Sequence, residues 1–160
     1  MGSDAVYLAL GANLGPREAT LEHAVELIGK MPTARLIARS QWIETAPEGG
    51  AEQPVYLNGV IRIACAIPPL TLLDLTQALE RQLGRKRKDD GSARPIDIDL
   101  LMYGDEQLVS PRLTLPHPRL TRRFFVLQPL AEIAPGLIIP GTGLSAAEWL
   151  RDVQGSARDN

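Results

Sequence analysis

The chain has 160 residues, enough for one compact domain and too few for an enzyme with a separate cofactor-binding half. Hydrophobic residues make up 44% and charged residues 22%, which excludes a chain disordered from end to end. The net charge of -2 predicts no general attraction to nucleic acid or anionic lipid, so any anion site must be local. The single cysteine, Cys65, excludes an internal disulfide, and its apolar neighbours predict a buried thiol in a reducing compartment.

The first half of the chain alternates between strand and helix patterns. A short apolar run over 6–10 predicts a buried strand, and it is too short to cross a membrane or to act as a secretion signal. We therefore expect a cytoplasmic protein. Apolar residues at helical spacing after Pro16 predict a helix to about residue 31. Residues 36–44 predict an extended strand, 46–54 a loop and 55–67 a second strand, stopped by Pro68.

The second half begins with another helix. Leu72, Leu75, Leu79 and Leu83 form its core stripe, Leu73, Gln77 and Glu80 form a neighbouring polar edge, and Gly84 is typical of its C-terminal cap. The charged composition of 85–94 predicts a mobile loop without a ligand. Residues 96–103 predict the clearest strand. Shorter apolar pieces follow at 113–116, 124–130 and 137–139, and then a final helix at 146–153.

This order of elements predicts the fold class. Strand, helix, strand, strand, helix, strand is typical of a ferredoxin-like α+β sandwich, βαββαβ, with helices packed on an antiparallel sheet. The remaining pieces would be C-terminal additions. We expect one domain over 1–153 and a polar tail over 154–160.

Two carboxylates lie within the clearest strand. Because side chains alternate along a strand, Asp97 and Asp99 share one face with Leu101 and Tyr103, while the even-numbered residues 96–102 take the other. Like charges on a half-buried strand repel, and Mg²⁺ relieves that cost by accepting carboxylate oxygens together with water and phosphate. An exposed edge strand with an acidic face is the alternative, and the scarcity of Asp in strands favours the metal site.

Basic residues bracket the acidic pair. Ten of the 17 Lys and Arg residues fall between 81 and 123, in a chain of net negative charge. Solvated loops would explain most such runs. Guanidinium groups beside carboxylates that hold Mg²⁺ are also what is needed to bind a polyphosphate, since arginine contacts phosphate oxygens in pairs. No nucleophile motif occurs, which favours direct transfer between two bound substrates.

Seven separated segments together carry a family resemblance. They are LGANLG at 10–15, ETAP at 44–47, QPVYLN at 53–58, ERQLGR at 80–85, RPIDIDLL at 94–101, LPHP at 115–118 and RFF at 123–125. The sequence resembles 6-hydroxymethyl-7,8-dihydropterin pyrophosphokinases of folate biosynthesis from about Val6 to Val153. The resemblance implies a ferredoxin-like fold, ATP as co-substrate, two Mg²⁺ ions, and transfer of a pyrophosphoryl group to the pterin hydroxymethyl group with release of AMP.

The resemblance also implies roles for particular residues. The metal pair would be Asp97 and Asp99, and the catalytic arginines Arg85 and Arg94. The ATP contacts would be Leu73, Gln77, Glu80, Arg87, Arg112, Thr114, His117 and Arg123. The pterin contacts would be Thr45, Tyr56, Asn58 and Phe125. A flat heteroaromatic ring is suited to aromatic faces, and an amide can both donate to and accept from its edge.

The sequence departs from the family pattern at three positions. Gly91 stands where relatives often have the tryptophan that closes over the pterin, Glu48 where an apolar residue is common, and Ala12 where serine is more usual. These positions bear on pterin affinity rather than on the phosphate residues.

Two other classes of protein share this order of elements. An RNA-recognition module would need stacking aromatics and a basic surface, but the chain is only 4% aromatic and net acidic. A small-molecule-sensing regulatory domain would have no use for Asp97 and Asp99 among basic neighbours. We therefore expect a monomer that acts on small molecules, without nucleic-acid or membrane partners.

Overall fold

The computed structural model describes residues 4–46, 54–85 and 93–159. In chain order the elements are β1 (Asp4–Ala12), α1 (Arg17–Gly29), β2 (Arg35–Arg39), β3 (Ile43–Thr45), β4 (Tyr56–Cys65), α2 (Pro69–Gln82), β5 (Asp97–Tyr103), β6 (Leu108–Val109), β7 (Thr114–Leu115), a 3₁₀ turn (Leu120–Arg122), α3 (Phe124–Ile133) and α4 (Ala146–Asp159). The expected helices and strands of the first 103 residues are confirmed, except that the segment 36–44 is divided. No helix in the described part of the chain is long and apolar enough to cross a membrane.

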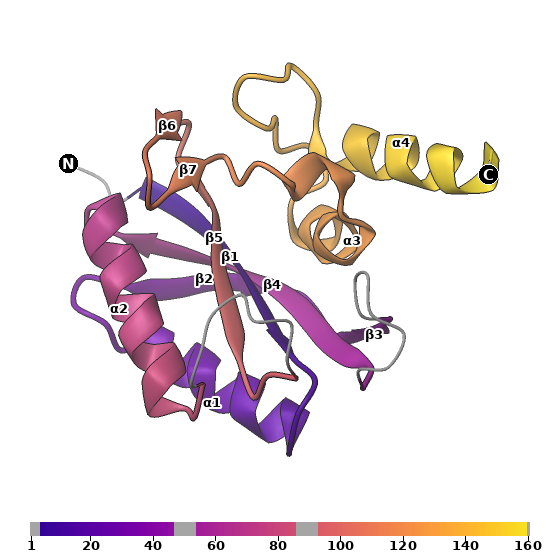
Figure 1. Cartoon of the computed structure of the whole chain (residues 1–160). Coiled ribbons are helices and arrows are strands. Elements are labelled where there is room, and N and C mark those ends of the chain that lie inside the picture. Colours follow the sequence, from indigo (N-terminus) through magenta and orange to yellow (C-terminus); the bar gives the residue numbers. More distant parts are fainter. Residues whose placement is uncertain (1–3, 47–53, 86–92, 160) are drawn as a thin grey trace.

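The central sheet has the strand order β2-β4-β1-β5, with β3 also paired to β4. Every pairing in it is antiparallel. The inner strands are β4 and β1, and β1 pairs with β4 on one side and β5 on the other (Figure 1). This is the βαββαβ arrangement of a ferredoxin-like fold, so the predicted fold class is confirmed.

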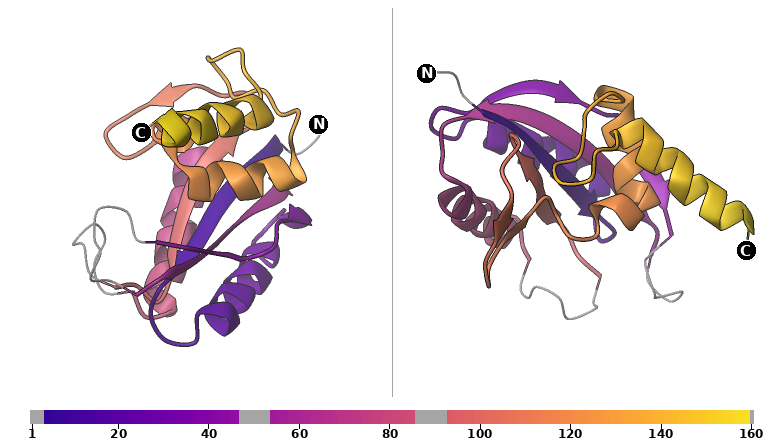
Figure 2. Two further views of the ribbon diagram at one scale, coloured as in Figure 1. Left: turned by 90° about the vertical axis from the view of Figure 1, so that its right-hand side faces the viewer. Right: turned by 90° about the horizontal axis from the view of Figure 1, so that it is seen from above.

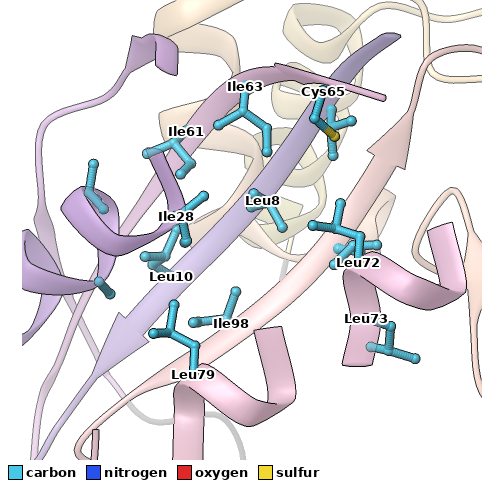
Figure 3. Packing of buried hydrophobic residues seen from close by; sticks show 14 of the residues in the cluster. Leu8, Leu10, Ile28, Ile61, Ile63, Cys65, Leu72, Leu73, Leu79 and Ile98 are labelled. Carbon is cyan, nitrogen blue, oxygen red and sulfur yellow. The ribbon is translucent and has the colours of Figure 1, made fainter. Parts of the chain in front are cut away.

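Helices cover both faces of the sheet (Figures 1 and 2). Against one face, α1 and α2 bury a core that includes Leu8, Ile28 and Leu72 (Figure 3). Against the opposite face, α3 and α4 contribute Leu127 and Leu150 to a second cluster. The apolar piece at 124–130 is therefore one side of a helix, and the C-terminal additions seal the second face of the sheet.

Strict alternation along β5 was predicted and is wrong beyond Leu101. The pairing register with β1 shifts between Tyr7 and Leu8, so that Leu101 has no partner residue. Such a bulge turns the following side chains over. Leu101 and Met102 consequently pack in the second cluster, and Tyr103 packs in the first. The shift leaves Asp97 and Asp99, which precede it, on their common face.

Two further boundaries differ from expectation. The segment 36–44 forms two short strands rather than one, because the Oγ of Ser40 accepts the backbone N–H of Val60 at 2.9 Å where strand pairing would otherwise continue. The final helix, predicted to end at Val153, continues to Asp159, so the expected polar tail is helical.

Gly84 confirms the predicted end of α2. Its φ of +105° is a conformation that glycine adopts without steric cost. The turn places Arg85 directly behind the helix, where its backbone N–H donates to Glu80 O at 3.0 Å. The cap therefore directs a charged side chain toward the start of β5.

Candidate active site

A cavity of about 390 Å³ lies between α2, β5 and the segment 110–123. It gathers residues that are distant in sequence but were predicted to share a site. Those lining it are Leu73, Gln77, Arg94, Asp97, Asp99, Arg112, Thr114, His117 and Arg123. The carboxylate pair and four of the predicted arginines and histidines thus face one space of a size suited to a small molecule.

Arginines engage the first carboxylate of the pair. The Oδ1 of Asp97 accepts from Arg85 Nη1, and its Oδ2 accepts from Arg94 Nη1 at 3.3 Å. Burial opposes the charge of the Arg85 guanidinium, but Asp97, Glu80 and Asp99 outweigh that cost and raise the pKa of Arg85. Arg85 is therefore a permanent cation, and Asp97 lies between two guanidinium groups.

Glu80 lies behind the cavity rather than on its wall. Its side chain is 3% exposed, and Oε2 accepts from Arg85 Nη1 at 2.9 Å and from the backbone N–H of Ile98 at 2.7 Å. The polar edge predicted for α2 is therefore divided. Gln77 faces the cavity, and Glu80 supports Arg85 and β5 from within the protein.

The strand-like segment after β5 supplies the far wall of the cavity. The backbone N–H of His117 donates to Leu101 O at 2.8 Å, which ties this segment to β5 at its bulge. The Nδ1 of His117 accepts the backbone N–H of Arg119 at 3.1 Å, which leaves Nε2 as the nitrogen that carries a proton. His117 is thereby a potential donor, as a phosphate oxygen would require.

Arg123 joins this wall to α3. It precedes the helix as its N-cap, and its guanidinium carbon lies 5.3 Å from the ring centre of Phe125, a cation-π arrangement. The position predicted for ATP and the aromatic predicted for the pterin are thus neighbours.

The other predicted pterin residues lie beside the cavity on β3 and β4. The Nδ2 of Asn58 donates to Thr45 Oγ1 at 2.5 Å. Burial raises the pKa of the Tyr56 hydroxyl, and the charges of Arg94 and Asp97 also act on it, which places Tyr56 close to the charged cluster. A polar, partly buried surface therefore adjoins the phosphate-like side of the site.

Asn13 holds the chain at Arg94, a contact that the sequence did not predict. Its backbone N–H donates to Arg94 O at 3.0 Å, and its Oδ1 accepts the Arg94 N–H at 2.7 Å. Its Nδ2 also donates to Pro54 O at 3.1 Å. One buried side chain thus ties β1 to the segments before β4 and β5. Its place in the LGANLG motif was the available signal.

The cavity also has lining residues that sequence reasoning missed. Ser110 and Arg119 are polar examples, and Ile98 and Leu100 give apolar surface. Arg119 was visible only as part of the basic stretch. Arg87, Glu48 and Gly91, like most of the predicted loop at 85–94, lie outside the described residues.

The donor set at the acidic pair suits a hard cation of the kind that keeps water and substrate ligands. Asp97 and Asp99 supply carboxylate oxygens from one strand face into a shared cavity. No group of three His, Cys, Asp or Glu side chains that could hold a metal occurs among the described residues. Two carboxylates with the remaining positions left to phosphate and water match Mg²⁺ rather than zinc.

Comparisons with known proteins agree with this geometry. A model of the family described as 7,8-dihydro-6-hydroxymethylpterin-pyrophosphokinase matches residues 7–135. The chain is 41% identical to a 2-amino-4-hydroxy-6-hydroxymethyldihydropteridine pyrophosphokinase of Methylorubrum extorquens over 95% of this chain and 96% of that relative. It is 40% identical to the protein of that name from Pseudomonas aeruginosa over 84% of this chain and 83% of the other.

The solved structures extend the likeness to the fold. The HPPK-DHPS protein of Plasmodium falciparum superposes with a TM-score of 0.79 at 15% identity. The match takes in 99% of this chain but 42% of that one, so the chain spans less than half of that larger protein.

Proposed function

The chain belongs to the 7,8-dihydro-6-hydroxymethylpterin-pyrophosphokinase family, and on that premise we propose how its own residues perform the reaction. The enzyme transfers the pyrophosphoryl group of ATP to the hydroxymethyl group of 6-hydroxymethyl-7,8-dihydropterin, a step of folate biosynthesis. The pterin oxygen forms a bond to the β-phosphorus of ATP, the bond from that phosphorus to the α,β-bridging oxygen breaks, and AMP leaves. The hydroxyl proton is released.

One observation carries the assignment of roles. A single cavity brings together Asp97 and Asp99 with Arg94, His117 and Arg123, beside the Asn58 and Thr45 pair. Polyphosphate needs positive charge and cation-holding carboxylates, whereas a heterocycle needs an aromatic face and a mixed donor and acceptor. The cavity supplies the charged groups, and the neighbouring surface supplies the aromatic ring and the amide.

Asp97 and Asp99 would hold two Mg²⁺ ions. Bound there, the ions would neutralise phosphate charge and polarise the transferring group. In this arrangement Arg94 lines the cavity and contacts Asp97, and Arg85, whose side chain is 4% exposed, contacts Asp97 from within the protein, so both guanidinium groups lie next to the proposed phosphate site. Their proposed role is to stabilise charge on the transferring group.

The ATP side would be formed by α2 and the segment after β5. Leu73 and Gln77 would contact the base and ribose side. The phosphates would be bound by the basic and hydroxyl donors Arg112, Thr114, His117 and Arg123. Arg87 and Glu80 complete the set of ATP residues that the family resemblance implies. Glu80 would act through Arg85, since its carboxylate is buried behind the cavity.

The pterin side would be formed by Thr45, Tyr56, Asn58 and Phe125. The amide of Asn58 would pair with the heterocycle edge, and the Phe125 ring, held under Arg123, would cover a face. We further propose that one domain over 1–153 works as a cytoplasmic monomer on these small molecules, without a nucleic-acid partner.

The direct test is the identity of the nucleotide product. Purified protein with ATP, Mg²⁺ and 6-hydroxymethyl-7,8-dihydropterin should release AMP in equal amount to pterin diphosphate, and EDTA should stop it. Release of ADP would contradict pyrophosphoryl transfer. Calorimetry with an uncleavable ATP analogue, with and without Mg²⁺, adds a binding measurement, and binding that ignores Mg²⁺ would contradict the metal assignment of Asp97 and Asp99.

A further inference from the structure

The middle of the site contains a residue without a side chain. Gly11 pairs with Asn58 on β4 in one direction and with Asp97 on β5 in the other. It therefore stands between the proposed pterin side and the proposed phosphate side. Glycine weakens a strand interior, since it adds conformational entropy to the unfolded chain and packs nothing.

The backbone does not explain this glycine. Gly11 lies within β1, and its φ is not in the positive range that favours glycine. Alanine could adopt its conformation without strain. The reason for glycine must therefore be the space beside its Cα.

That space is filled by the side chain of Asn58. A Cβ on Gly11 would lie within 3.0 Å of Asn58 Oδ1, closer than real Cβ atoms approach, and 3.5 Å from Asn58 Cγ and from Tyr56 Cδ1. On its other side the amide is held by the bond from Nδ2 to Thr45 Oγ1. A new methyl group would therefore displace the amide from the position in which it makes that bond.

We propose that Gly11 is a positioning residue that sets the orientation of the Asn58 amide toward the heterocyclic substrate. This inference rests on the proposed function. With one N–H given to Thr45, the amide retains a second N–H and a carbonyl oxygen. That pair matches the edge of a lactam-containing heterocycle, which presents an acceptor beside a donor. Because Gly11 has no Cβ, the Asn58 amide can lie directly over the β1 backbone.

The test is Gly11→Ala, with binding of 6-hydroxymethylpterin and of an uncleavable ATP analogue measured separately by calorimetry. We expect pterin affinity and the pterin KM to worsen at least tenfold, while ATP-analogue affinity and kcat at saturating pterin stay within about twofold. Thermal stability should change little, because the gain from alanine in a strand offsets the loss of the bond between Asn58 and Thr45. Gly29→Ala is the matched control, since a Cβ there meets nothing within 4 Å, and it should leave both affinities unchanged.

A mutant cycle separates an action through Asn58 from a general disturbance. In an Asn58→Ala background the amide is gone, so Gly11→Ala should cause no further loss of pterin affinity, and the double variant should fold even where the single one does not. An additive loss would overturn the inference, as would equal loss of ATP and pterin binding in Gly11→Ala. If the wild-type protein itself binds no pterin, the proposed function fails and not the role of Gly11.

Discussion

Two clusters in different parts of the molecule each pair an arginine with carboxylates. In the first, Arg85 contacts Glu80 and Asp97, and the side chains of Arg85 and Glu80 are 4% and 3% exposed. In the second, Arg39 donates two bonds to Glu22, and their side chains are 36% and 46% exposed. The ring N–H of Trp42 donates to the same Glu22 carboxylate at 2.7 Å.

Burial makes these clusters behave differently. Water can take over from any partner lost between α1 and β2, so the exposed pair stabilises the protein little. Around Arg85 water cannot take over so easily, and removal of Glu80, its most buried partner, leaves the guanidinium poorly compensated, whereas Asp97 is 21% exposed and partly hydrated. The buried cluster is also the one that adjoins the cavity. Its charges are held in fixed positions, as electrostatic stabilisation of a reacting group requires.

The largest expected loss of activity comes from the two carboxylates at the cavity end of the buried cluster. Asp97→Asn and Asp99→Asn should each lower kcat by at least about 10³-fold, because each removes a charge from the proposed cation site. The fold should persist, since Arg85 keeps Glu80 and the loss of one of two repelling carboxylates costs little. Steady-state rates at saturating Mg²⁺ and thermal melts measure both. Turnover near that of wild type in either variant would contradict the assignment.

The arginines should show a smaller effect of a distinct kind. Arg94→Ala is expected to lower kcat about 10²-fold, on the order of 3 kcal/mol, with little change in the affinity for an ATP analogue, because its contact strengthens in the transition state. Arg39→Ala, on the exposed cluster, is the control and should leave kcat unchanged. A higher KM for ATP with an unchanged kcat would instead make Arg94 a docking residue.

Glu80 tests the structural side of the buried cluster. Glu80→Gln keeps the shape but removes the charge opposite Arg85, and it should lower the free energy of unfolding by about 3 kcal/mol. Urea titration measures this, with Glu22→Gln as the matched control, for which the loss should stay below about 1 kcal/mol. Equal losses in the two variants would show that burial does not distinguish the clusters.

The smallest expected effect depends on pH. The bonds from Arg39 and Trp42 hold the pKa of Glu22 below its ordinary value. A lowered pKa in the folded state contributes stability above the unfolded pKa, and that contribution is lost as pH falls through the folded pKa. The difference in unfolding free energy between wild type and Glu22→Gln should thus be present at pH 7 and decline as the pH falls below the ordinary carboxyl pKa. A constant difference would show that the pair acts through packing.

Local patterns predicted the parts of the molecule that depend on one element. Alternation along residues 96–100 placed Asp97 and Asp99 on a common face, and leucine spacing on α2 marked its core stripe. Features that depend on two elements were out of reach. Glu80 on α2 can be buried only because the backbone N–H of Ile98 on β5 donates to it. The bulge at Leu101 arises from the pairing of β5 with β1. The strand pattern at 6–10 ends before Gly11, so the place of Gly11 between Asn58 and Asp97 could not be predicted from it.

The family resemblance added what spacing could not. It brought Arg112, Thr114 and His117 into one hypothesis although no periodic pattern connects them, and the cavity contains all three. It assigned no role to Asn13 or Arg119. Each makes a contact between a side chain and a backbone N–H: Asn13 Oδ1 accepts from Arg94, and His117 Nδ1 accepts from Arg119.

The central position of β1 has a consequence for how the protein comes into being. This strand pairs with β5, and Val6 lies opposite Tyr103, so β1 is synthesised long before the strand that fills its second edge. Contacts so far apart in sequence are entropically slow to form, and until they do, β1 exposes a free strand edge. Gly11 and Asp97 meet only in that last pairing. Catalytic competence should therefore appear late in refolding, after α1, β4 and their hydrophobic contacts have formed.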